Sequence, residues 1–213
     1  MSTEATLILT QWMSPAYPLG SFAYSHGMET EIAARTLHDA AGVQAWIGAV
    51  LRHGAGQSDA VLLRAGFGSD ASGVREVDAI ARAYAGSAER LEETVQQGVA
   101  FALTTSAIWG IDVPPLTHPV AVGYAAGQMD LPLDLTVTMY LQSFAANLVS
   151  CAVRAVPLGQ TEGQRMTATL VQTAAEVATA SAGIPLEDLG ACAFAADIAA
   201  MRHETLEPRI FRT

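Results

Sequence analysis

Two adjacent residues near the C-terminal end, His203 and Glu204, begin like a zinc-protease motif. In that motif, HExxH, two histidines one helical turn apart share a zinc ion and the glutamate acts as a general base. Here Glu207 occupies the position of the second histidine, and it is followed by Pro208, a residue that cannot continue a helix. The spacing therefore excludes a zinc protease.

A helical enzyme of another kind stays open as an alternative. In that hypothesis His203 and Glu204, with the pair Ser25 and His26, act as acid and base groups or as metal ligands. Against it, the sequence contains no GxSxG elbow, no Walker loop and no GxGxxG segment. We therefore predict that the protein is not an enzyme, has no catalytic residues and binds no cofactor.

The histidines are too scattered for a metal site. The chain has five, and none has another histidine or cysteine three or four positions away: His26, His38, His53, His118 and His203. Nickel and similar ions need several histidine, cysteine or carboxylate ligands. We expect no tight metal site in one chain, although a symmetric oligomer could bring copies of His203 or Cys192 together.

The composition predicts a helical protein that does not bind nucleic acid. Apolar residues make up 51% of the 213 residues, charged residues 15%, and forty residues are alanine, the strongest helix former. The formal net charge of −10 opposes binding to a polyanion. Two cysteines without CxxC spacing, and the absence of basic residues before Leu7, favour a reduced, cytoplasmic protein without a secretory signal.

A membrane-associated helical protein is the second alternative, because the mean hydropathy is positive at +0.28. The stretch from Leu135 to Val153 carries no charge. It does contain several polar side chains, namely Thr136, Thr138, Gln142, Ser143, Asn147 and Ser150. Such a stretch suits a buried or interface helix better than a lipid-facing one, so we expect no membrane span.

Apolar periodicity and capping residues divide the chain into helices. We expect helices at 4–13, 24–35, from an N-cap at Asp39, at 58–67, from about 74, from an N-cap at Ser87 to about 108, from Pro132, from a capping box at Thr161-Glu162-Gly163-Gln164 to about 183, and at 194 to 203 or 204. Segments 68–73 and 110–118 are expected to be loops. The prediction is one all-α globular domain of about eight to ten helices over 1–205, with a short partner-binding tail at 206–213.

Three segments resemble the urease accessory protein F family. Residues 9–29, LTQWMSPAYPLGSFAYSHGME, resemble its S-x-x-x-P-x-G-x-[FY]-x-x-S-x-G-[LM]-E signature. Residues 156–164, VPLGQTEGQ, resemble its P-L-G-Q-T-x-G-Q segment, and residues 202–213, RHETLEPRIFRT, resemble its closing R-H-E-x-x-x-x-R-[LI]-F-x-[ST]. The departures are mild: Ser21 replaces a common glycine, Pro208 replaces a small polar residue, and Thr213 replaces a common serine.

The resemblance implies an all-α, non-catalytic protein that forms a homodimer. It implies binding to the accessory protein called D or H, recruitment of the GTPase called G, and docking on apo-urease for nickel insertion, with nickel handled by the assembly. Both chain ends bind partners in that family. On that basis we expect partner contacts from Phe22, Tyr24, Ser25, His26, Glu29, Arg202, His203, Glu204, Leu206, Arg209, Ile210 and Phe211.

The tail also carries the residue types of an interface. Its apolar residues alternate with arginines: Leu206, Ile210 and Phe211 stand among Arg202, Arg209 and Arg212. Exposed apolar side chains mixed with arginine are typical of binding hot spots. The alternative is that the tail packs on its own domain, because chain termini are either docked or disordered.

Overall fold

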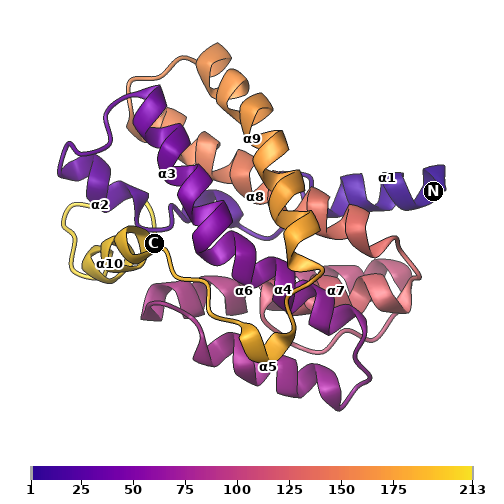
Figure 1. Ribbon diagram of the computed structural model, residues 1–213. Coiled ribbons are helices and arrows are strands. Elements are labelled where there is room, and N and C mark those ends of the chain that lie inside the picture. Colours follow the sequence, from indigo (N-terminus) through magenta and orange to yellow (C-terminus); the bar gives the residue numbers. More distant parts are fainter. Residues whose placement is uncertain (1, 213) are drawn as a thin grey trace.

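The computed structural model describes residues 2–212 as a set of helices joined by short connections, with no strand in that range (Figure 1). Met1 and Thr213 lie outside the described residues. The α-helices are α1 (Thr3–Trp12), α2 (Met28–Ala33), α3 (Ala40–His53), α4 (Ala55–Phe67), α5 (Gly73–Ala83), α6 (Ala88–Trp109), α7 (His118–Gln128), α8 (Leu133–Ala155), α9 (Gln160–Ser181) and α10 (Phe194–His203). Two short 3-10 helices, η1 (Ser21–Ala23) and η2 (Leu186–Asp188), complete the chain. The predicted all-α fold class is confirmed.

Two of the predicted helix starts are confirmed by their caps. The side chain of Asp39 accepts a hydrogen bond from the Gly42 N–H at the start of α3. Ser87 does the same for the Arg90 N–H at the start of α6. In each case a short polar side chain satisfies a backbone donor that has no partner inside the helix.

Two other predictions about helix starts are wrong. The capping box at Thr161 does not form, because α9 begins at Gln160 after Gly159 and no side chain caps it. The helix expected over 24–35 is reduced to α2, since His26 (φ 54°) and Gly27 (φ 73°) adopt left-handed conformations that interrupt it. Residues before α2 are therefore free to lie along another helix.

Helix α7 was not predicted, and the tight packing of α7 against α4 explains why. A Cβ atom on Gly123 would lie 2.0 Å from the carbonyl oxygen of Leu63, so only glycine allows this close approach. Glycine weakens a helix in isolation, and α7 contains Gly123 and Gly127. Tertiary packing outweighs local propensity here.

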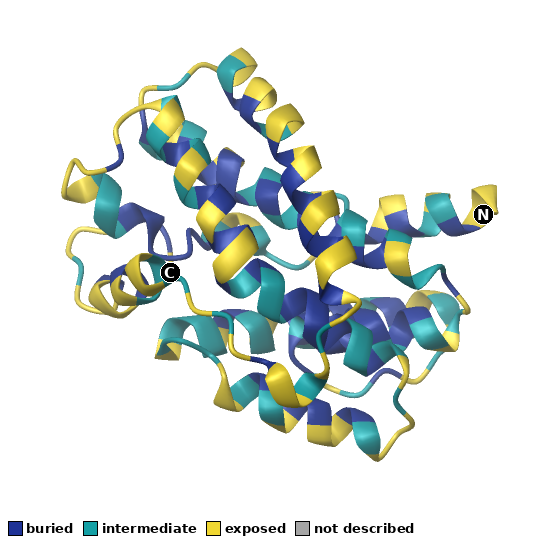
Figure 2. Ribbon diagram, in the orientation of Figure 1, coloured by how far each residue is buried: buried dark blue, intermediate teal, exposed yellow. Residues whose placement is uncertain are grey.

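Helix α8 holds the uncharged stretch and is surrounded by protein. It packs against α9, α3 and α4, and Leu141, Ala145 and Leu148 on its core side are fully buried. The exposed positions on α9 lie along its outer side (Figure 2). Among residues 2–212, no helix is both long and apolar enough to cross a membrane.

The two chain ends run to different places. Helix α1 extends from one side of the body, whereas α10 lies beside α2 with the C-terminal tail next to them (Figure 1). The connection between α1 and α2 carries the chain from one side to the other. This connection and the tail form the site described next.

Candidate functional site

The connection after α1 lies on the polar side of α8. The Asn147 side-chain amide donates to the Ser21 carbonyl at 2.9 Å, and the Arg154 guanidinium donates to the Phe22 carbonyl. The Cys151 thiol donates to the Tyr24 carbonyl at 3.2 Å. One face of α8 thus supplies hydrogen bonds to the exposed backbone of an irregular segment, which fixes that segment on the body.

The tail packs back on the domain, next to the same segment. Phe211 is only 3% exposed, and the Arg154 guanidinium lies 4.8 Å from the centre of its ring, a cation–π contact. The Arg212 N–H donates to the Ala23 carbonyl at 2.7 Å. Residues 22–23 and 211–212 therefore lie side by side, although they are far apart in sequence.

A buried carboxylate holds the tail backbone in place. One oxygen of Glu29 accepts the Ile210 N–H at 2.6 Å, and the other accepts the Phe211 N–H at 2.8 Å. Glu29 is 6% exposed. Two consecutive backbone donors on one carboxylate make charge-assisted hydrogen bonds, which are stronger than neutral ones.

His203 links this carboxylate to a second one. Its Nε2 lies 3.0 Å from Glu29 Oε2 and its Nδ1 lies 2.8 Å from Glu89 Oε2. The two ring nitrogens thus each lie within hydrogen-bond distance of a carboxylate oxygen, and the ring bridges α2 and α6. Glu89 also accepts from Arg209 Nη1 at 2.6 Å. We call Glu29, Glu89, His203 and the Ile210–Phe211 backbone the tail junction.

The expected partner-binding residues fall into two groups. The buried group cannot present its side chains to another protein without movement: Tyr24, Ser25, His26, Glu29, His203 and Phe211. The accessible group comprises Phe22, Arg202, Glu204, Arg209 and Ile210, with Leu206 half-buried. Phe22 is 64% exposed and Ile210 is 75% exposed, which is unusual for large apolar side chains.

A second buried group of charges lies deeper and was not predicted from the sequence. We call it the internal cluster: His26, Asp59, Arg90, Glu93 and His118. Glu93 bonds to His26 at 2.9 Å and to the Arg90 guanidinium. The Tyr140 hydroxyl donates to Asp59 at 2.7 Å and lies 3.5 Å from His118.

Burial and neighbouring charges shift the pKa values in the internal cluster. Burial raises the pKa of Asp59 to about 6 and lowers that of His118 to about 4, because each site disfavours the charged form. Burial also acts against the charge of Glu93, but Arg90 and His26 together lower its pKa to about 2. Arg90 and Glu93 thus form a buried ion pair.

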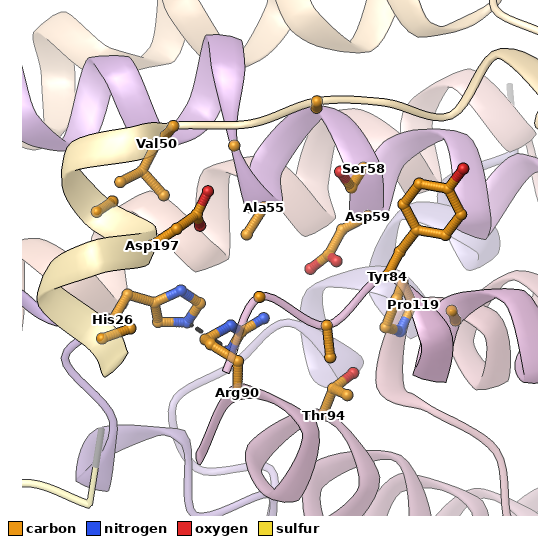
Figure 3. A pocket seen from close by; sticks show the side chains of 18 of the residues that line it. His26, Val50, Ala55, Ser58, Asp59, Tyr84, Arg90, Thr94, Pro119 and Asp197 are labelled. Atoms are coloured by element: carbon orange, nitrogen blue, oxygen red, sulfur yellow. Dashed lines mark hydrogen bonds between the residues drawn. The ribbon is translucent and has the colours of Figure 1, made fainter. Parts of the chain in front are cut away.

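Two cavities meet at this cluster. One, of about 100 Å³, is bordered by α4, α6 and α10, and the other, of about 210 Å³, lies under the connection after α1. The residues that line both are His26, Asp59, Arg90 and Thr94. Figure 3 shows Asp59 and Arg90 directed into the smaller cavity from opposite sides.

One sequence signal could have indicated the internal cluster. Arg90, Glu93 and Gln97 recur at a helical spacing of three and four, so they share one side of α6. That side also carries Phe101, which is fully buried. Charges in line with a buried aromatic residue indicate a polar core rather than a solvated face.

The described residues do not group into a metal site. Within residues 2–212, no three histidine, cysteine, aspartate or glutamate side chains are placed to hold one ion. Cys151 is buried and Cys192 is exposed. The hydrogen bonds of the tail junction hold chain segments that are far apart in sequence.

Known proteins resemble this chain over its whole length. A model of the UreF family matches residues 37–171. The urease accessory protein UreF of Roseobacter denitrificans is 51% identical over 213 residues, which cover 100% of this chain and 96% of that protein. UreF of Cereibacter sphaeroides is 50% identical (99% of this chain, 100% of that protein), and UreF of Jannaschia sp. is 48% identical (99% and 96%). The chain therefore belongs to the UreF family of urease accessory proteins.

Proposed function

We propose that this protein is a non-enzymatic chaperone of urease maturation, an adaptor that links other accessory proteins to apo-urease for nickel insertion. Its partners in this proposal are the D- or H-type accessory protein, the GTPase G and the urease subunits. It acts in the cytoplasm as a homodimer, and nickel is cargo of the assembly. Family membership supports the role in maturation.

The observation that carries the adaptor role is that the connection after α1 and the C-terminal tail lie side by side. Phe22 and Ile210 are exposed, and the backbone beside each is fixed by Arg154 or Glu29. Arg209 and Arg212 stand next to Ile210 with exposed side chains. We call Phe22, Arg209, Ile210 and Arg212 the end surface. Apolar anchors on a fixed backbone beside arginines have the composition of a binding hot spot.

The alternative enzyme hypothesis gains no support from the geometry around His203. Its ring is fully buried between two carboxylates, so a substrate cannot reach it without displacement of the tail. Glu204 is exposed and accepts the Ala88 N–H at 3.0 Å at the start of α6. Both residues have structural partners that account for their presence.

The test is co-purification of the accessory proteins with a variant of the end surface. Phe22→Ser combined with Ile210→Ser removes two exposed anchors and should abolish recruitment, while circular dichroism and the melting temperature stay as in the wild type. The matched control is Leu103→Ser with Val171→Ser, since these side chains are 70% and 49% exposed on α6 and α9. Recruitment should survive in the control.

Two results would contradict the proposal. One is full assembly and urease activation with the doubly substituted end surface. The other is an equal loss of recruitment in the control pair, which would mean that recruitment depends on exposed apolar residues in general and not on the end surface. A folded variant that fails to recruit partners, beside a control that recruits them, supports the adaptor role.

A further inference from the structure

Two buried charges in the internal cluster face the same cavities without meeting. Asp59 projects from α4 and Arg90 from α6 (Figure 3). Asp59 is 8% exposed, and the Arg90 side chain is 15% exposed. Among residues 2–212, no ion pair within 4.0 Å joins them, although both line both cavities.

Each group uses only part of its hydrogen-bonding capacity. Asp59 Oδ2 accepts the Tyr140 hydroxyl, whereas Oδ1 has no hydrogen bond within the described chain. Arg90 Nη1 contacts His26 and Glu93, whereas Nε and Nη2 donate to no described residue. An acceptor on one wall of the cavity therefore faces donors on the other.

The chemistry of the walls selects the kind of molecule that fits between them. Burial opposes the charge of Arg90, but Glu93 and Asp59 keep the guanidinium protonated by raising its pKa. A cation would be repelled by Arg90, and an anion would be repelled by Asp59 and Glu93. An uncharged group that donates on one side and accepts on the other satisfies both walls.

We propose that the cavity between Asp59 and Arg90 binds a small uncharged amide, either a simple primary carboxamide or urea. The amide N–H₂ donates to Asp59 Oδ1, and the carbonyl accepts from Arg90 Nε or Nη2. The smaller cavity of about 100 Å³ accommodates a molecule of this size, because about 10–15 Å³ measured in this way suffices for one water. The Thr94 side chain also borders the cavity.

Such a ligand would connect two helices that carry different parts of the protein. Asp59 belongs to α4 in the core, and Arg90 follows Glu89, which holds His203 and Arg209 in the tail junction. Occupancy would restrain α6 beside the residue that anchors the tail. Among the described residues that line the smaller cavity, none belongs to the end surface, so its test is independent of the adaptor proposal.

The experiment is a titration of the full chain at pH 7.5, followed by the ¹H–¹⁵N signal of the Arg90 Nε–H group. Acetamide and urea are the probes. Acetone is the matched control, because it has the shape and carbonyl of acetamide but no N–H donor. We expect a saturable shift with acetamide and urea in the millimolar range, since ligands this small bind weakly. Acetone should give no saturation.

A variant sharpens the assignment. Asp59→Asn keeps the shape of the side chain but removes the charge, so acetamide affinity should fall roughly tenfold, as expected for loss of a hydrogen bond to a charged group. Asp197→Asn, at another position in the lining of the same cavity, should leave the affinity unchanged. Three results would overturn the proposal and mean that the cavity holds water only. They are a shift that rises linearly with amide concentration, an equal shift with acetone, and an unchanged acetamide affinity in Asp59→Asn. The acetone comparison stands even if Asp59→Asn fails to fold.

Discussion

The tail junction and the internal cluster are both buried groups of charged side chains, yet they differ in how fully their members are hydrogen-bonded. In the tail junction, Glu29 and Glu89 are occupied by a histidine, an arginine and two backbone N–H groups. In the internal cluster, Asp59 and Arg90 each keep an unused edge toward a cavity. A buried charge is stabilising only when its partners are complete.

The two groups of buried charges differ in what they connect. The bonds of the tail junction cross up to 182 positions of sequence, so they join chain segments that nothing local would bring together. The internal cluster joins helices already packed by apolar contacts, including α6 with α7. Loss of the Glu29 charge should therefore destabilise the tail junction, whereas loss of the Asp59 charge should stabilise the internal cluster.

The largest effect is expected from Glu29→Ala. This change leaves His203 and two backbone donors without their acceptor, and removal of one member of such a buried pair costs about 3–5 kcal/mol. Guanidinium denaturation measures the loss, and hydrogen exchange at the Phe211 amide should become fast. Glu187→Ala, on the exposed η2, is the control and should change stability by less than about 0.5 kcal/mol. Equal losses in both variants would show that the tail junction contributes little.

Phe211→Ala tests the same region through its apolar contact. Removal of a buried phenylalanine side chain costs about 3 kcal/mol or more. Ile210→Ala, one position away and 75% exposed, should stay within about 0.5 kcal/mol. Hydrogen exchange at the Arg212 amide, which is bonded to Ala23, reports whether the tail stays docked. If Phe211→Ala is as stable as Ile210→Ala, the tail does not depend on burial of the ring.

Asp59→Asn is the opposite test, made in the internal cluster. Burial raises the folded-state pKa of Asp59 from 3.8 to about 6, so ionisation becomes unfavourable to folding as pH rises through this window. That cost is complete above about pH 6 and amounts to about 1–3 kcal/mol. The asparagine variant should therefore be more stable than the wild type at pH 7.5, and the gain should vanish near pH 4. Denaturation of both proteins at the two pH values measures it.

A loss of stability in Asp59→Asn would contradict the contrast between the two regions. If Asp59→Asn is less stable than the wild type at pH 7.5, the carboxylate is compensated in solution and the internal cluster is as complete as the tail junction. Asp39→Asn is a useful control, because the exposed asparagine still caps α3. The stability of the protein should be nearly the same with aspartate or asparagine at position 39.

The sequence predicted the elements whose signals are local. Asp39 and Ser87 cap helices in the way that their position indicates, and the last helix ends at His203 as expected. Two of the three segments that resemble the family, residues 9–29 and 202–213, contain residues that contact each other in the structure, such as Ala23 with Arg212 and Glu29 with Phe211. A cap or a motif acts within a few residues, so one sequence carries enough information to recognise it.

The missed features depend on contacts between distant residues. Helix α7 is stabilised by its close approach to α4, which Gly123 permits, and no local pattern reports that contact. The internal cluster was missed because Arg90 and Glu93 have the composition of a solvated face. Glu29 was expected to contact a partner, and its bonds to the Ile210 and Phe211 N–H groups were not foreseen, because they join residues far apart in sequence.

The smallest effect on the free protein is expected at Arg209, where the structure separates two roles. Its side chain is 45% exposed and contacts Glu89 through Nη1, and a half-exposed ion pair of this kind contributes at most about 1 kcal/mol. Arg209→Lys should keep that single contact, so stability and the slow exchange of the Phe211 amide should match the wild type. Arg209→Ala should lose up to about 1 kcal/mol.

Partner recruitment should distinguish the two variants of Arg209 from the wild type in another way. Nε and Nη2 make no hydrogen bond within the described residues, so the planar guanidinium keeps donors that can engage a partner, and lysine cannot reproduce that geometry. We therefore expect both Arg209→Lys and Arg209→Ala to weaken co-purification of the accessory proteins, although only the alanine variant loosens the tail. If Arg209→Lys recruits partners as well as the wild type does, the contribution of Arg209 is confined to Glu89, and the partner is recognised by the other residues of the end surface, Phe22, Ile210 and Arg212.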